Sequence, residues 1–76
     1  MTTPNQILVD LIPGQATPDA LAERIRIPML TIKAMCDRHV KDGLLIAKSI
    51  AQGTLTTYSL TEEGRAVASK LNLQHA

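Results

Sequence analysis

The sequence predicts a single, mainly helical α+β domain, with three helices followed by a two-stranded β-hairpin and a fourth helix. Three apolar stripes at helical spacing lie within residues 4–42, and each begins at a proline. Residues 44–60 instead form two strand-like segments, rich in apolar and β-branched residues, around a short connection that contains glycine. A last helical stripe follows within residues 61–72.

The first helix is predicted over residues 4–12. Thr3 suits the N-cap position, and Pro4 suits the first helical position because the amide donor that proline lacks has no partner there anyway. The sequence Pro13-Gly14 ends the helix. Residues 15–16 are too few for an independent strand, but they could add one short rung to a sheet formed later. The expected buried stripe comprises Ile7, Leu8, Leu11 and Ile12.

The second and third helices are predicted to form a helix-turn-helix. Thr17, followed by a proline, caps a helix over 18–26, and Pro28 starts another over 28–42 almost at once. Because the connection is so short, the two helices must cross steeply to bury their stripes. Gly43 ends the third helix. The stripes comprise Ala20, Leu21, Ala22 and Ile25, then Ile32, Met35, Cys36, His39 and Val40.

The hairpin is predicted from strands over 44–50 and 54–60, joined by a connection that contains Gly53. Tyr58 and Leu60 lie two residues apart and therefore share one face of the second strand. We expect them to pack beneath the hairpin, with the tyrosine hydroxyl reaching water or a partner.

The last helix is predicted over residues 61–72, with Thr61 at its start and two glutamates in its first turn, where they favour the helix dipole. Its apolar face toward the domain is expected to comprise Val67, Ala68 and Leu71. The resulting order of elements (three helices, hairpin, helix) is that of a winged helix-turn-helix.

Length and composition limit the possible classes of protein. Seventy-six residues form one small domain, and no apolar run approaches the roughly 20 residues that span a bilayer. The N-terminus lacks the basic flank and long apolar block of a secretory signal, and a single cysteine excludes an internal disulfide. We therefore expect a cytoplasmic protein without a membrane segment.

The net charge is only +1, but the charges are unevenly distributed. Residues 1–23 hold three acids and no bases, residues 24–48 hold six bases and two acids, and the signs cancel in residues 49–76. Positive charge is thus concentrated on the helix-turn-helix and the strand after it, where a phosphate-facing surface needs it. The alternative interpretation is that these are ordinary solvated side chains on amphipathic helices.

Two segments resemble the winged-helix regulators of bacteria and their phages, including the MarR-like group. The first is LAERIRIPMLTIKAMCDRHVKDGLL, and the second, after the hairpin, is YSLTEEGRAVASKL. In that pattern, "LAE" lies in the helix before the recognition helix, "DGLL" closes the recognition helix, and "LTEEG" opens the helix after the hairpin. The resemblance spans residues 17–71, which is most of the chain.

The resemblance implies binding to double-stranded DNA, with the 28–42 helix in the major groove and the 44–60 hairpin touching backbone or minor groove. The exposed face of that helix would present Pro28, Met29, Leu30, Thr31, Lys33, Ala34, Asp37 and Arg38. Lys33 and Arg38 would contact bases or phosphates, and Arg24 and Arg26 would contact phosphates. The full set of expected DNA contacts is Arg24, Arg26, Met29, Leu30, Thr31, Lys33, Arg38, Lys48, Gln52 and Thr54.

Two features favour a second hypothesis from another class. Met29 and Leu30 make the start of the recognition helix apolar, and the hairpin connection Ala51-Gln52-Gly53 is uncharged. An exposed apolar face is typical of protein-docking surfaces. The alternative is therefore a winged-helix interaction module, such as a phage or plasmid adaptor or inhibitor that binds a protein partner through Met29-Leu30.

No catalytic activity and no cofactor are predicted. Cys36 and His39 lie three residues apart, but both fall on the predicted core face without further metal ligands nearby in sequence. We expect His39 to be a neutral residue at the edge of the core with one satisfied ring nitrogen.

Regulators of this fold often dimerise. If this chain forms a homodimer, the surface should involve Ile7, Val9, Leu11, Val67, Leu71 or Leu73.

Overall fold

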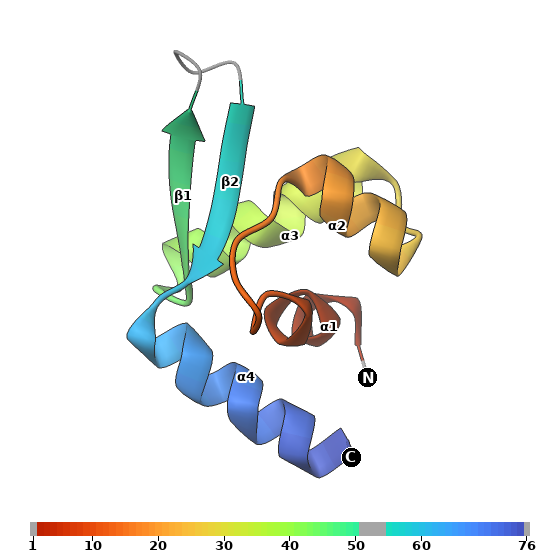
Figure 1. The fold of residues 1–76 in the computed structure, drawn as a ribbon. Coiled ribbons are helices and arrows are strands. Elements are labelled where there is room, and N and C mark those ends of the chain that lie inside the picture. The colour runs from red at the N-terminus through yellow and green to blue at the C-terminus, as the bar shows by residue number, and fades with distance from the viewer. Residues whose placement is uncertain (1, 51–54, 76) are drawn as a thin grey trace.

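All six predicted elements form in the predicted order. A computed structural model describes residues 2–50 and 55–75. The elements are α1 (Thr3–Asp10), α2 (Pro18–Ile25), α3 (Met29–Lys41), β1 (Leu45–Ile50), β2 (Leu55–Leu60) and α4 (Glu62–His75). Figure 1 shows the hairpin rising beside α2 and α3, while α4 crosses beneath α1 at the other end of the molecule. The α+β winged helix-turn-helix architecture predicted from the sequence is therefore confirmed.

Most ends of the elements differ from the predicted ones by one to three residues, while the start of α2 and the ends of both strands agree. Thr2, not Thr3, is the N-cap of α1, and α1 ends at Asp10 because the following residues turn toward Pro13, which disfavours helical backbone before it. Pro28 is the N-cap of α3 rather than its first residue, with an extended backbone (φ −52°, ψ 140°). Each strand begins one residue later than predicted, and α4 continues to His75.

The caps predicted at Thr17 and Thr61 are confirmed. Thr17 Oγ1 accepts a hydrogen bond from the Ala20 amide at 3.2 Å. Thr61 Oγ1 accepts one from the Gly64 amide at 2.9 Å and donates one to the Gly43 carbonyl at 2.7 Å. Gly43 has a positive φ of 81°, as expected for the residue that ends a helix. The threonine hydroxyl thus joins the end of one helix to the start of another.

The hydrophobic core lies where α1, α2, α3, the hairpin and α4 meet, and its buried residues are Ile7, Leu8, Leu11, Ala16, Leu21, Ile32, Cys36, Leu45, Tyr58, Leu60 and Ala68. Two of the residues named for a dimer surface, Ile7 and Leu11, are at most 1% exposed, so that part of the prediction is wrong. They are buried because α1 packs against α2, α3 and α4. Leu73, by contrast, is exposed.

The inward face of α4 is predicted correctly at two of its three residues. Ala68 is buried and Leu71 packs partly buried against the core, but Val67 is exposed, and Gly64, which was not predicted, is buried. Gly64 approaches the backbone carbonyl of Leu44 so closely that a β-carbon there would overlap it. The inward stripe is therefore set by a close backbone contact, with small residues at four-residue spacing, and it leaves Val67 outside.

The sheet consists of β1 and β2 in antiparallel register, from Leu45 opposite Leu60 to Ile50 opposite Leu55. Ala16 forms the predicted extra rung on the other side of β2, with backbone bonds of 3.1 and 2.8 Å to Tyr58. Tyr58 is 1% exposed and Leu60 is 9% exposed, which confirms that both pack beneath the hairpin. No described helix is long and apolar enough to cross a membrane.

Candidate nucleic-acid interface

Helix α3 has two faces with opposite environments. Its inward face consists of Ile32, Cys36 and His39, all at most 8% exposed. On the outward face, Leu30 is 78% exposed, and Lys33, Ala34, Asp37 and Lys41 are also exposed. These outward residues recur every three or four positions, so they lie on one side of the helix. This outward face is the candidate binding surface.

The inward polar residues serve packing. The His39 side chain is joined to the Pro4 carbonyl oxygen through Nε2 at 2.9 Å, so its predicted place at the edge of the core with one satisfied nitrogen is confirmed. Burial, with a smaller effect from the charge of Asp37, raises the pKa of the Cys36 thiol from 9.0 to about 12. The thiol is therefore protonated and unreactive near neutral pH. Within the described residues, no three His, Cys, Asp or Glu side chains are grouped as a metal site.

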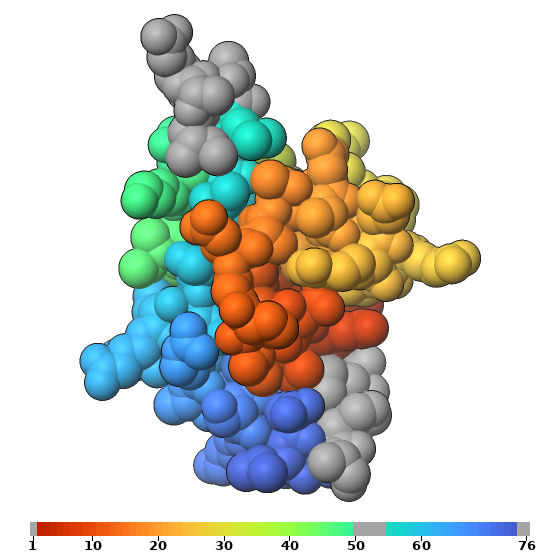
Figure 2. All heavy atoms as spheres, in the orientation of Figure 1, coloured from red at the N-terminus to blue at the C-terminus, as the bar shows by residue number. Residues whose placement is uncertain are grey.

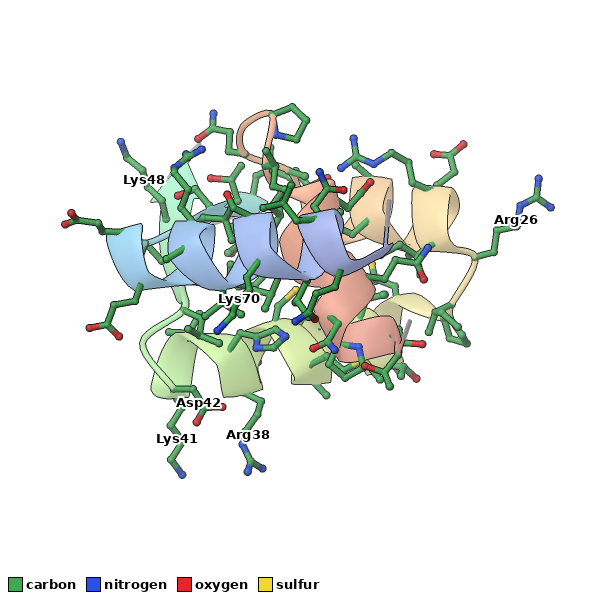
Figure 3. The ribbon with its side chains drawn as sticks, turned by 90° about the horizontal axis from the view of Figure 1, so that it is seen from below. Arg26, Arg38, Lys41, Asp42, Lys48 and Lys70 are labelled. Carbon is green, nitrogen blue, oxygen red and sulfur yellow. The ribbon has the colours of Figure 1, made fainter. Side chains whose placement is uncertain are left out.

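The basic residues of α3 project into solvent. Figure 3 shows Arg38 and Lys41 extending away from the body of the molecule on the α3 side. The Arg38 guanidinium lies 3.7 Å from the Asp42 carboxylate, and both side chains are more than half exposed, so this pair is weak. Lys41 was not among the predicted contacts, although its spacing from Lys33 and Asp37 (eight and four residues) places the three on one stripe.

Arg24 and Arg26 lie in different situations. Arg24 forms a 2.7 Å ion pair with Asp10, which ties α2 to α1. Arg26 ends α2 in the left-handed conformation, with φ 64° and ψ 45°, and its amide bonds to the Ala22 carbonyl at 2.8 Å. Figure 3 shows its side chain projecting alone from the far end of the molecule. Arg26 is therefore open to a phosphate, while Arg24 is already partnered.

The structure places Lys48 apart from the basic residues of α3. Ala47 pairs with Tyr58, whose hydroxyl reaches α3, so the neighbouring Lys48 points from the opposite face of the sheet. Figure 3 shows Lys48 on the side of the molecule away from Arg38 and Lys41. Gln52 and Thr54, also predicted as contacts, lie outside the described residues.

A shallow cleft flanks α3 on each side. The first, about 240 Å³, lies toward the hairpin and includes Met29 and Lys33 of α3 together with Thr17, Asp19 and Leu55. The second, about 260 Å³, lies toward α1 and is lined by Pro4, Thr31, Ala34, Met35, Arg38 and His39. The predicted contacts Met29 and Lys33 therefore face one side of α3, and Thr31 and Arg38 face the other. Leu30 lies on the ridge between them. In the space-filling view, α2 and the described part of the hairpin project from the opposite end to α4 (Figure 2).

The exposed outward face of α3, the helix-turn-helix formed by α2 and α3, and the hairpin together define a winged helix-turn-helix domain. No known family profile matches the sequence, and no curated protein matches it. Solved structures do match. The adhesin competence repressor AdcR of Streptococcus pyogenes superposes with a TM-score of 0.91 at 24% identity, over 99% of this chain and 56% of that one.

Two further structures extend the comparison. A variant of ZitR from Lactococcus lactis, solved in complex with DNA, has a TM-score of 0.88 at 21% identity, over 99% of this chain and 52% of that one. The transcriptional regulator BldR of Sulfolobus solfataricus has a TM-score of 0.84 at 21% identity, over 93% and 52%. This chain thus spans little more than half the length of these regulators. The resemblance to winged-helix regulators inferred from sequence is confirmed in the fold.

Proposed function

We propose that this chain is a small DNA-binding transcriptional regulator, with α3 in the major groove of double-stranded DNA. The observation that carries the proposal is the outward face of α3, where Lys33 and Lys41 are exposed on a helix that lies next to the hairpin. An α-helix with one exposed face fits the major groove, and lysines supply phosphate contacts. The ZitR variant of similar fold was solved in complex with DNA, which supports DNA as the partner.

The proposed contacts differ in what they bind according to their position. Lys33, Arg38 and Lys41 are expected to neutralise phosphates at the edges of the groove, and Arg26 is expected to bind a phosphate at the turn. Leu30 is placed to contact a thymine methyl, and Met29 and Thr31 flank it. Arg24 contributes less because Asp10 already neutralises it. The hairpin contacts Lys48, Gln52 and Thr54 remain predictions.

A salt titration tests the proposal. The dissociation constant for a labelled generic duplex is measured by fluorescence anisotropy at several salt concentrations, for the unchanged chain, Lys33→Ala and Lys70→Ala. Each phosphate neutralised contributes about −0.9 to the slope of the logarithm of the association constant against the logarithm of the salt concentration. Lys33→Ala is therefore expected to make the slope shallower by about 0.9. Lys70→Ala is the matched control, since it removes the same charge from the exposed surface of α4.

Two outcomes would contradict the proposal. The absence of salt-dependent association even at low salt would contradict DNA binding itself. An equal change of slope for both lysine variants would contradict binding through α3, because it would indicate attraction of DNA to the whole molecule. In either case the apolar Met29-Leu30 surface would be the starting point for identifying a protein partner.

A further inference from the structure

Asp37 is an acidic residue in the middle of the surface proposed to face DNA. It is exposed, and it lies one helical turn from Lys33 on one side and from Lys41 on the other. Neither lysine is within ion-pair distance of it among the described residues. A carboxylate at this position repels phosphates, so a role in general affinity for DNA is excluded.

Tyr58 holds the Asp37 carboxylate in place. Its hydroxyl donates a hydrogen bond to Asp37 Oδ1 at 2.9 Å, and its ring is 1% exposed. The backbone of Tyr58 is fixed on one side by two hydrogen bonds to Ala16 and on the other by pairing with Ala47. The buried tyrosine is therefore a rigid support from the hairpin to α3. No hydrogen bond to the second oxygen, Oδ2, is found in the described part of the chain.

We propose that Asp37 is a specificity-determining residue that accepts a hydrogen bond from the N4 amino group of a cytosine in the major groove, and that Tyr58 is its positioning residue. This inference rests on the proposed DNA-binding function. Lys33 and Lys41 would contact phosphates on either side, leaving the central position of the stripe to the base edges. A side chain held by a buried hydroxyl loses little further freedom when it binds.

The chemistry of the carboxylate selects the base. An ionised carboxylate can only accept hydrogen bonds, and the guanine and thymine edges in the major groove present acceptors to it. Adenine offers its N6 amino group, but the adjacent N7 acceptor repels a second negative atom. Because the Tyr58 hydroxyl donates to Oδ1, Oδ2 is the carboxylate oxygen without a hydrogen bond among the described residues, and it can accept one from the amino group of cytosine.

Selection from a random duplex library tests the inference. The purified full chain and its Asp37→Asn, Tyr58→Phe and Asp42→Asn variants are each used to enrich bound duplexes, which are then sequenced. Asp37→Asn keeps an oxygen for the Tyr58 hydroxyl but replaces the second acceptor by an amide donor. Asp42→Asn is the matched control, because it removes the same charge at the C-cap of the same helix.

The expected result is a cytosine preference of about tenfold at one position for the unchanged chain, lost in Asp37→Asn and weakened in Tyr58→Phe. Asp42→Asn is expected to retain it. Asp37→Asn should unfold at an unchanged temperature, and its affinity for a generic duplex should not fall. If Asp37 had a purely structural role, its replacement would instead lower the unfolding temperature. An unchanged motif in Asp37→Asn, or a motif without a cytosine-dependent position, overturns the inference while leaving DNA binding intact. A chain that retains no duplex at all overturns the proposed function as well.

Discussion

The inward and outward faces of α3 belong to one helix of thirteen residues, but their side chains are under different physical constraints. Ile32 and Cys36, on the inward face, are completely buried, so their size and shape are fixed by the surrounding core. Leu30 on the outward face is 78% exposed and has almost no packing to satisfy. The inward face therefore determines whether the domain folds, whereas the outward face is free to adapt to what the domain binds.

The largest expected effect comes from truncating the two faces at matched positions. Ile32→Ala removes fully buried methylene groups and is expected to lower the free energy of unfolding by about 2–5 kcal/mol. Leu30→Ala should change it by about 0.5 kcal/mol or less. Chemical denaturation of both variants measures the difference. If Ile32→Ala does not fold, Ile32→Val replaces it, with an expected decrease in the free energy of unfolding of about 0.5–1.5 kcal/mol. Equal losses at positions 30 and 32 would contradict the division between the faces.

The inward face could be predicted from sequence because its signals are local. Prolines and capping threonines fix the starts of the helices, and the 3.6-residue period then identifies Ile32, Cys36 and His39 as core. The prediction of the buried face failed on α4, where a contact between residues far apart in sequence determines which side chains point inward. Val67 belongs to the apolar period of α4, yet the close approach of Gly64 to Leu44 turns it outward. No local pattern reports such an approach.

The candidate site was less predictable, because exposure and charge do not fix the partner of a side chain. Sequence could place Lys33, Asp37 and Arg38 on the exposed part of α3, but not the hydrogen bond from Tyr58, a residue 21 positions away from Asp37. The pairing of Arg24 with Asp10 is equally non-local. The left-handed backbone of Arg26 also gives no signal, since most such positions hold glycine or asparagine.

High pH should lower the stability of the domain through two buried groups, Cys36 and Tyr58. Burial raises the pKa of Cys36 to about 12, and burial together with the hydrogen bond to Asp37 raises the pKa of Tyr58 above its ordinary value of 10. In the unfolded chain both groups ionise at their ordinary pKa, so unfolding releases protons above pH 9 to 10. Stability is therefore complete below that range and falls as pH rises, by up to about 1.4 kcal/mol per pH unit for each group.

Denaturation curves between pH 8 and pH 11, at roughly half-unit steps, measure this slope. Tyr58→Phe and Cys36→Ala should each remove one part of it, whatever their stability at neutral pH. Retention of the full slope when both are combined would show that other groups, such as the lysines, cause the alkaline loss.

The smallest expected effect concerns Arg24, which is exposed like the outward face of α3 but serves to join two helices. Its ion pair with Asp10 is short, at 2.7 Å, but the Arg24 side chain is half exposed, so solvent screens the attraction. A double-mutant cycle with Asp10→Asn and Arg24→Gln should give a coupling energy of about 0.2–1 kcal/mol. Because Asp10 already neutralises the guanidinium, Arg24→Gln should also change the salt dependence of DNA binding less than Arg26→Gln does. If the two arginine variants lowered that dependence equally, Arg24 would have to leave Asp10 for a phosphate on binding. The end of α2 that carries Arg24 would then belong to the DNA-binding surface together with α3.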